Sequence, residues 1–431
     1  MTGSASLGRR VLEWLVPARI GMPFRRVLGA NTISNLGDGI LIAAGPLLAA
    51  SLTDDPFLIS IAALVVQLPW LVLSLGAGVI VDRLSRLPLI HIASWVRAAV
   101  LTVLIALIGL SVLDLPMLFV CLFALGCCEV FLDTSWSSIV PDLVPSRELG
   151  IANARLSASH RIMNQLLGPA LGGLLFVVAH AIPYGAAVVT TLLALVVIAG
   201  MRVPDHRDPD AADSVEQGLA RLRTELAEGI SWLWNHAPMR VLSLTLFAFN
   251  ITYGITWGLL VIWATRTLGL DAGGYGLLMA VSAVGGVVGA AAYGWLEERC
   301  SYGLIMRVSL SLEVLVHASF AMTSHWGFAV PIFLVFGAYD TVWTGINQTI
   351  RGRAVPSAVR GRVSAVFMLA NFGGIAIGTP IGGAIASLTS VSTAMWCAAA
   401  GTALALALVW RMLPKIADAG AMPEGTAQPH S

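Results

Sequence analysis

The sequence predicts an all-α membrane protein with twelve transmembrane helices in two six-helix pseudo-repeats. Of its 431 residues, 57% are hydrophobic and only 11% are charged, with a mean hydropathy of +0.83. Soluble globular proteins carry charge on roughly a quarter of their residues. Apolar stretches of ~20 residues, enough to cross a bilayer as a helix, recur along the chain. Short motifs in the first half also return in the second half, which predicts the repeat.

The expected spans are apolar stretches bounded by proline, glycine and charged residues. They fall at 26–50, 57–81, 88–112, 115–139, 160–180, 183–201, 241–265, 272–296, 303–323, 327–350, 362–387 and 391–412. The fifth and sixth stretches are separated by a very short junction around His180–Ile182. The total of twelve therefore depends on a chain reversal at that point.

The basic residues predict how the chain crosses the membrane. Short cytosolic loops are enriched in lysine and arginine. If both termini lie in the cytosol, Arg266 is the only arginine in an outside loop, whereas the opposite orientation would place most arginines outside. We therefore expect a multi-pass membrane protein with cytosolic N- and C-termini.

One long polar connection divides the chain into two halves. Its first part, Asp205–Asp213, is expected to be a flexible linker, and Ser214–Trp234 has leucines at helical spacing. The predicted organisation is a basic interfacial segment at 1–24, a six-helix bundle at 25–202, a cytosolic linker with an amphipathic helix at 203–239, a second bundle at 240–413, and a disordered cytosolic tail at 414–431.

The two halves repeat with a constant offset. Gly126-x-x-Glu129 corresponds to Gly337-x-x-Asp340, and Pro169 before a glycine pair corresponds to Pro380 before another. Parallel six-helix repeats are typical of transporters whose substrate site lies near the bilayer midplane between the halves.

Ionisable groups inside a membrane span are costly and indicate functional sites. The candidates for proton coupling are Asp38, Glu129, Asp133 and Asp340. Polar and aromatic residues on the same predicted helix faces are candidates for a substrate cavity: Asn31, Asn35, Trp136, Asn250, Tyr253, Trp257, Thr344 and Asn347. The alternative is that these groups only hydrogen-bond neighbouring helices, or that Arg97 or Arg161 pairs with one of the carboxylates.

Glu129 and Asp133 lie one helical turn apart, so their carboxylates should titrate as a coupled pair. We expect Asp133 to exchange protons and Glu129 to contact the substrate. Glu313 and His317 have the same spacing, which fits either a proton relay or an internally satisfied pair.

Two further motifs predict gating and close packing. The gating candidates are Gly78, Asp82, Arg83 and Arg86 in a predicted cytosolic turn, with Glu298 and Arg299 as their repeat counterparts. Asp82 is expected to latch the inner face; anchoring by positive charge is the alternative. The packing candidates are Gly168, Pro169, Gly172 and Gly173, where small residues would let helices approach closely.

Other functional classes lack their residue patterns. The single lysine, Lys415, does not belong to a phosphate-binding loop, so ATP hydrolysis by this chain is not expected. The cysteines have no metal-ligand spacing, and no nucleophile–base set indicates an enzyme. We expect no cofactor, no metal and no nucleic-acid partner. The expected partners are a small-molecule substrate, protons as the coupling ion and the lipid bilayer, with the chain acting as a monomer.

The motifs resemble those of the major facilitator superfamily, in particular its bacterial twelve-span macrolide and enterobactin exporters. The resemblance covers about residues 25–413 and rests on Asn31–Gly39, on the loop Gly78–Arg86, and on Pro141–Asn153 followed by Gly168–Gly173. The loop keeps Gly78, Asp82, Arg83 and Arg86 of the family pattern, with Ser85 and Leu87 at two other positions.

The resemblance implies a secondary active transporter that exports drug-like or natural-product molecules by proton antiport with alternating access. The alternatives are a siderophore exporter, an importer or uniporter on the same fold, and a membrane sensor that has lost transport. The resemblance does not identify the substrate, because one fold serves many substrates.

Overall fold

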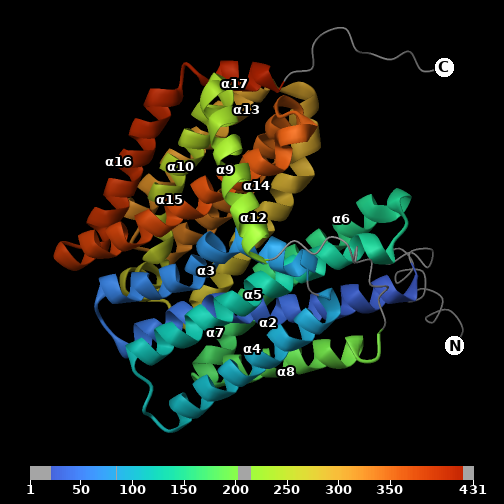
Figure 1. Ribbon diagram of the computed structural model, residues 1–431. Helices are drawn as coiled ribbons and strands as arrows, with labels where there is room; N and C mark the ends of the chain where they lie inside the picture. The colour runs from blue at the N-terminus through green and yellow to red at the C-terminus, as the bar shows by residue number, and fades with distance from the viewer. Residues whose placement is uncertain (1–20, 84, 202–214, 421–431) are drawn as a thin grey trace, which may run out of the picture. The chain divides into compact units, whose positions relative to one another are not determined.

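The protein is described by a computed structural model that covers residues 21–83, 85–201 and 215–420. The side chains of residues 79, 82–83 and 215–220 are also outside the described part. Every regular element in the described ranges is helical (Figure 1). The all-α prediction is therefore confirmed.

The first half contains helices α2 to α8. Their bounds are α2 Met22–Leu52, α3 Pro56–Arg83, α4 Arg86–Gly109, α5 Leu115–Leu143, η2 Ser146–Glu148, α6 Leu149–Ser159, η3 His160–Leu167, α7 Gly168–Val178 and α8 Ile182–Ile198. Helix α9, Val215–Asn235, follows as the amphipathic helix that the sequence predicts.

The second half contains helices α10 to α17. Their bounds are α10 Ala237–Gly258, α11 Leu260–Ile262, η4 Trp263–Thr267, α12 Ala272–Arg299, α13 Tyr302–Met322, α14 Trp326–Ala354, η5 Ser357–Val359, α15 Arg360–Leu388, α16 Val391–Val409 and α17 Leu413–Ala419.

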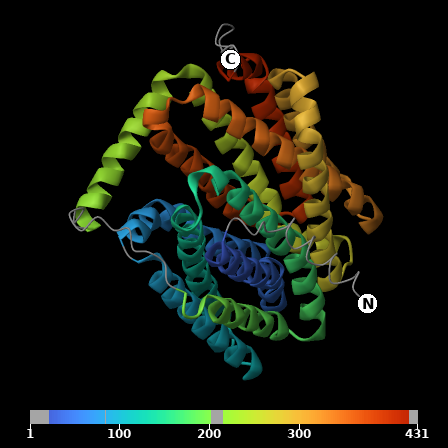
Figure 2. The same ribbon diagram turned by 90° about the vertical axis from the view of Figure 1, so that its right-hand side faces the viewer.

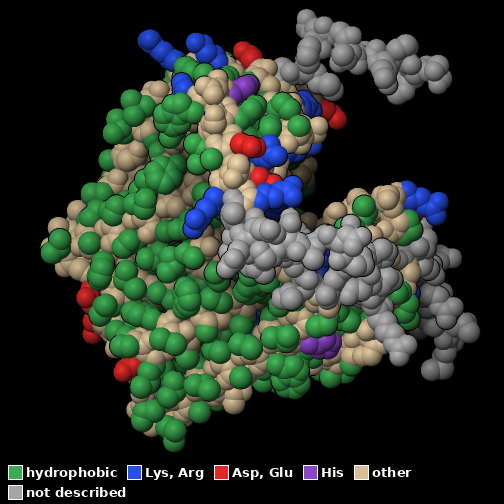
Figure 3. All heavy atoms as spheres, in the orientation of Figure 1, with side chains coloured by type: hydrophobic (Ala, Val, Ile, Leu, Met, Phe, Trp, Pro, Cys, Tyr) green, Lys and Arg blue, Asp and Glu red, His purple; other side chains and the backbone are tan. Residues whose placement is uncertain are grey.

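Eleven helical segments within the described residues are long and apolar enough to cross a membrane. The short apolar helix α8, Ile182–Ile198, accounts for the twelfth predicted span. Large apolar side chains remain exposed on these helices, including Val72, Val120 and Val178. The face drawn in Figure 3 accordingly shows a wide area of hydrophobic side chains. Such a surface is stable against lipid but not against water.

Local sequence explains where several helices begin and where one is distorted. Asp114 precedes α5 and accepts a 2.8 Å hydrogen bond from the Met117 amide, as an N-cap does. Ser390 caps α16 in the same way at 3.1 Å. Pro169 lacks an amide hydrogen and would clash with the preceding turn of a straight helix. The chain immediately before it, η3, widens into a π-helical segment.

The helices form two compact units. Unit 1 comprises the described residues within 1–52, 72–219 and 272–280, and unit 2 those within 53–71, 220–271 and 281–431. The start of α3 therefore groups with unit 2 and the start of α12 with unit 1. The predicted bundle boundaries at 25–202 and 240–413 stay a prediction, because these units are defined by packing and not by chain order.

Glycines permit the close helix contacts inside unit 1. A Cβ on Gly168 would lie 2.5 Å from the Cα of Gly39 on α2, and one on Gly172 would collide with the Ile40 carbonyl oxygen. Gly173 faces the backbone of Gly276 in α12. Figure 2 shows α2, in dark blue, enclosed by helices of this unit. The packing candidates of α7 thus lie directly against α2 and α12.

In unit 2, the first part of α3 packs against α15. The Phe57 amide donates a 3.0 Å hydrogen bond to the Ser387 hydroxyl, and Trp70 stacks on Phe372 with ring centroids 5.9 Å apart. These contacts explain why the start of α3 belongs to unit 2, although the rest of the helix does not.

Candidate functional site

Polar residues of unit 1 lie on one buried face of α2. The Asn35 side-chain amide donates a 2.9 Å hydrogen bond to Asn31 Oδ1. His160 Nδ1 lies 3.3 Å from Asn35 Oδ1 and extends this network to η3. Asp38 follows one turn further along and is also buried. The predicted polar face of the first span therefore points into unit 1.

Asp38 forms an ion pair with Arg97 of α4. Both residues are buried, with exposures of 8% and 2%. Arg97 donates to Asp38 through Nη1, while its Nε and Nη2 atoms have no hydrogen-bond partner among the described residues. Of the two arginines that the sequence offered as partners, Arg97 is the one that binds this carboxylate.

Glu129 and Asp133 of α5 join this group. The charges of Asp38, Asp133 and Arg97 act on Glu129, and those of Asp38 and Arg97 act on Asp133. Three carboxylates in this cluster thus share one guanidinium. In a low-dielectric interior such an excess of negative charge is costly unless protons or a cationic ligand neutralise it.

Trp136, the third candidate on this face of α5, is buried in the hydrophobic core of unit 1. It packs in a cluster that includes Val27, Leu132 and Ile139. Its indole nitrogen has no hydrogen-bond partner among the described residues. The structure therefore places Trp136 in the core, one turn from Asp133.

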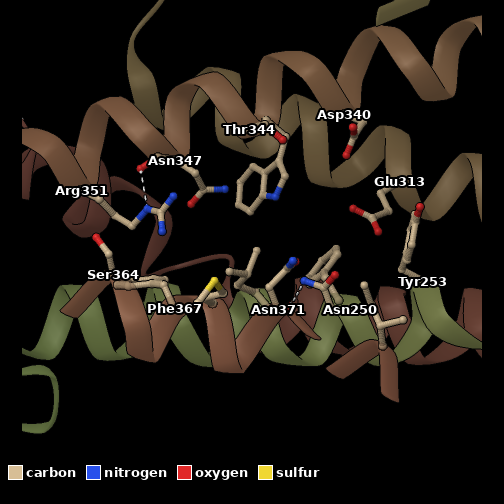
Figure 4. Close-up of a pocket in the computed structure, with 15 residues that line it drawn as sticks. Asn250, Tyr253, Glu313, Asp340, Thr344, Asn347, Arg351, Ser364, Phe367 and Asn371 are labelled. Atoms are coloured by element: carbon tan, nitrogen blue, oxygen red, sulfur yellow. Dashed lines mark hydrogen bonds between the residues drawn. The ribbon is translucent and has the colours of Figure 1, made fainter. Parts of the chain in front are cut away.

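Unit 2 contains a cavity of about 410 Å³ between α10, α13, α14 and α15 (Figure 4). Five of its lining residues were predicted from the sequence: Asn250, Tyr253, Asp340, Thr344 and Asn347. The remaining lining residues are Leu246, Phe249, Glu313, Trp343, Arg351, Ser364, Phe367, Met368, Asn371 and Ile375.

Trp257 does not line this cavity but lies beside it. Its ring stacks on Tyr253, with centroids 5.3 Å apart, and on Phe336 at 6.2 Å. Tyr253 and Phe336 also stack, at 6.2 Å. Trp257 therefore holds the Tyr253 ring in place at the wall.

Glu313 and Arg351 were not among the cavity residues predicted from the sequence. Glu313 was considered only with His317, whose Nδ1 lies 2.9 Å from the Glu313 backbone carbonyl oxygen. The carboxylate instead faces the cavity, within electrostatic range of Asp340. Arg351 was counted only as a cytosolic positive charge. Its position one turn after Asn347 was the available signal, because such residues share a helix face.

The structure describes only part of the predicted gating motif after α3. Gly78 has open space around it, and the side chains of Asp82 and Arg83 lie outside the described residues, so their latch stays a prediction. Arg86 pairs with Asp142 at the end of α5.

At the corresponding place in unit 2, Glu297 accepts a 2.6 Å hydrogen bond from Tyr302 and lies 3.5 Å from Arg353. The predicted Arg299 has its guanidinium carbon 5.2 Å from the ring centre of Trp295. The neighbouring Glu298 remains a gating prediction. Within the described ranges, no group of three His, Cys, Asp or Glu residues could hold a metal ion.

The fold and these buried polar clusters define a multi-pass membrane transporter. Residues 14–429 match the transmembrane secretion effector family of the major facilitator superfamily. The chain belongs to this family and is a transporter, not an enzyme.

Its relatives include enterobactin exporters. The chain is 26% identical to enterobactin exporter EntS of Citrobacter koseri, over 86% of this chain and 87% of that protein. It is 26% identical to EntS of Salmonella typhimurium, over 92% of this chain and 96% of that protein.

Solved transporter structures share the fold. The nucleoside transporter NupG superposes with a TM-score of 0.72 at 14% identity, over 92% of this chain and 100% of that chain. A bacterial homologue of the iron transporter ferroportin, in an inward-facing state, superposes with a TM-score of 0.68 at 16% identity, over 92% and 98%. The predicted major facilitator fold is confirmed.

Proposed function

We propose that this transporter exports a small natural product across the bacterial cytoplasmic membrane by proton antiport. The observation that carries the proposal is the cluster of Asp38, Glu129 and Asp133 around Arg97, the cation that acts on all three among the described residues. Because the cluster has more carboxylates than cations, loading and release of protons is the simplest way for it to change charge during a transport cycle.

We assign proton exchange to Asp133 and substrate contact to Glu129. The cavity of unit 2 would contribute polar contacts to the substrate, with Asp340, Asn250 and Thr344 among them. The chain would work as a monomer by alternating access, with both termini in the cytosol.

A siderophore is a second candidate substrate, because the relatives at 26% identity are enterobactin exporters. Drug-like compounds remain the other candidate. Uptake of enterobactin and of ethidium, measured separately into vesicles that contain the purified protein, would distinguish these two classes.

The coupling is tested in proteoliposomes with an imposed pH gradient. The double variant Glu129→Gln with Asp133→Asn should lose gradient-driven uptake, because it removes both α5 carboxylates of the cluster around Arg97. Glu225→Gln is the matched control, since Glu225 lies on α9 and pairs with Arg221 one turn away. Full gradient-driven uptake by a monodisperse double variant would place the proton site elsewhere, with Asp38 as the next candidate.

Direction of transport needs a second measurement. Whole-cell accumulation should rise when a protonophore collapses the gradient if the chain is an exporter. A fall in accumulation would favour an importer, and no change in cells or vesicles would favour a sensor without transport activity.

A further inference from the structure

The cavity of unit 2 carries opposite charges at its two ends. Figure 4 shows Arg351 beside Ser364 and Phe367 at one end of the row of side chains, and Glu313, Asp340 and Tyr253 at the other. Of the fifteen lining residues, Glu313 and Asp340 are the only acids and Arg351 is the only base. Opposite charges are therefore separated along the cavity.

Helix geometry sets the separation of the two ends. Asp340 and Arg351 lie eleven residues apart on α14, which corresponds to about 16 Å along the axis. Arg351 donates from Nε to the Asn347 carbonyl oxygen at 3.3 Å, so its side chain leans back along the helix. Asn347 is seven residues from Asp340, or about 10 Å. The charged ends are thus about 10–16 Å apart.

The basic end is shaped for a planar acidic group. The Arg351 guanidinium lies over the Phe367 ring, 4.8 Å from its centre. This contact restrains the guanidinium, and a guanidinium binds a carboxylate through two parallel hydrogen bonds more readily than an ammonium does.

Between the two ends, next to Arg351, the cavity contains a hydrogen-bond acceptor without a partner among the described residues. Asn347 is 5% exposed, and its Oδ1 atom has no hydrogen-bond partner among the described residues. A buried acceptor without a partner is costly, and a ligand N–H group would satisfy it. The side-chain amides of Asn250 and Asn371 also line this section.

We propose that this cavity binds an elongated zwitterion, with an amine near Glu313 and Asp340, an amide-bearing middle beside Asn347, and a carboxylate at Arg351. Short peptides and peptide-like natural products have this chemistry. The inference rests on the proposed function in assigning a substrate class to the exporter, but binding to the cavity can be measured without transport.

The test uses four forms of one tetrapeptide, Ala-Lys-Ala-Ala with a dansyl group on the lysine side chain. Its extended length of about 13 Å matches the separation of the charged ends. The forms have free termini, an acetylated N-terminus, an amidated C-terminus, or both blocks. Binding to the purified full chain in detergent is followed by dansyl fluorescence anisotropy.

The free peptide should bind at least about tenfold more tightly than either singly blocked form, because each block removes a charge-assisted contact. Glu313→Gln should abolish the preference for a free N-terminus and keep the preference for a free C-terminus. Arg351→Gln should do the reverse. A general loss of structure would not produce these opposite changes.

Matched controls make the same chemical changes elsewhere. Arg353→Gln alters an exposed arginine two residues away on α14, outside the lining of the cavity, and Glu225→Gln alters the helix α9. Both should keep the wild-type ranking of the four peptides. If a glutamine variant fails to fold, Glu313→Asp and Arg351→Lys retain the charges and should keep the ranking in weakened form.

Equal binding of all four peptides by the wild-type chain, or no binding of any, would overturn the zwitterion inference. Gradient-driven uptake of enterobactin or ethidium would still support proton-coupled export in that case. Conversely, selective peptide binding without gradient-driven uptake would support the cavity chemistry and contradict the proposed antiport.

Discussion

The buried ion pair between Asp38 and Arg97 makes a quantitative prediction about stability. Both side chains are almost inaccessible, at 8% and 3% exposure, and Asp38 accepts the only hydrogen bond that Arg97 makes among the described residues. Asp38→Asn removes the charge that compensates the guanidinium. Breaking a buried pair on one side costs about 3–5 kcal/mol, because the remaining ion loses its direct partner.

A more exposed pair of the same unit supplies the control. The side chains of Arg86 and Asp142 are 29% and 17% exposed. Solvent screens such a pair, so Asp142→Asn should lower the free energy of unfolding by about 1 kcal/mol or less. The comparison keeps the chemical change identical and varies only the burial of the pair.

The assay is reversible unfolding of the purified protein in mixed micelles with a rising fraction of dodecyl sulfate, followed by tryptophan fluorescence. The double variant Asp38→Asn with Arg97→Gln should recover a large part of the loss, because it leaves no guanidinium without its hydrogen-bonded partner. A loss below about 1 kcal/mol for Asp38→Asn, with no coupling in the double variant, would refute the reasoning, since breaking a buried pair should cost several times more.

Two further predictions concern packing and topology. Gly172→Ala should destabilise the contact of α7 with α2 by about 1–3 kcal/mol, because its Cβ would collide with the Ile40 carbonyl oxygen. Gly150→Ala is the control in the same micelle assay and should have no such cost, because Gly150 has open space around it. Reporter fusions at residues 53 and 114 should report the external side of the membrane, and a fusion at residue 210 should report the cytosol. An external signal at residue 210 would contradict the predicted arrangement of the two halves.

Part of the candidate site could be predicted from residue spacing alone. Asn31, Asn35 and Asp38 share a face of one helix, and they lie together in unit 1. Asn347, Thr344 and Asp340 likewise line one cavity from α14. Spacing predicts such groupings because side chains three and four residues apart project from the same side of a helix.

Spacing did not predict which helices meet. Arg97 lies 59 residues from Asp38 along the chain, and nothing in either motif selects it over Arg161. Glu313 comes to the cavity from α13 while its predicted partner, His317, contacts only its backbone among the hydrogen bonds described. Trp136 shares the polar face by spacing, yet it packs into the core.

The sequence by itself determined the class of fold, because a chain in lipid must satisfy its backbone hydrogen bonds within each helix. Long apolar stretches then define the spans locally, without reference to the rest of the molecule. The tertiary structure alone decided the pairing of Asp38 with Arg97 and the opposite placement of Glu313 and Arg351. Those arrangements depend on the rotation and packing of whole helices, which are governed by close contacts such as that of Gly39 with Gly168.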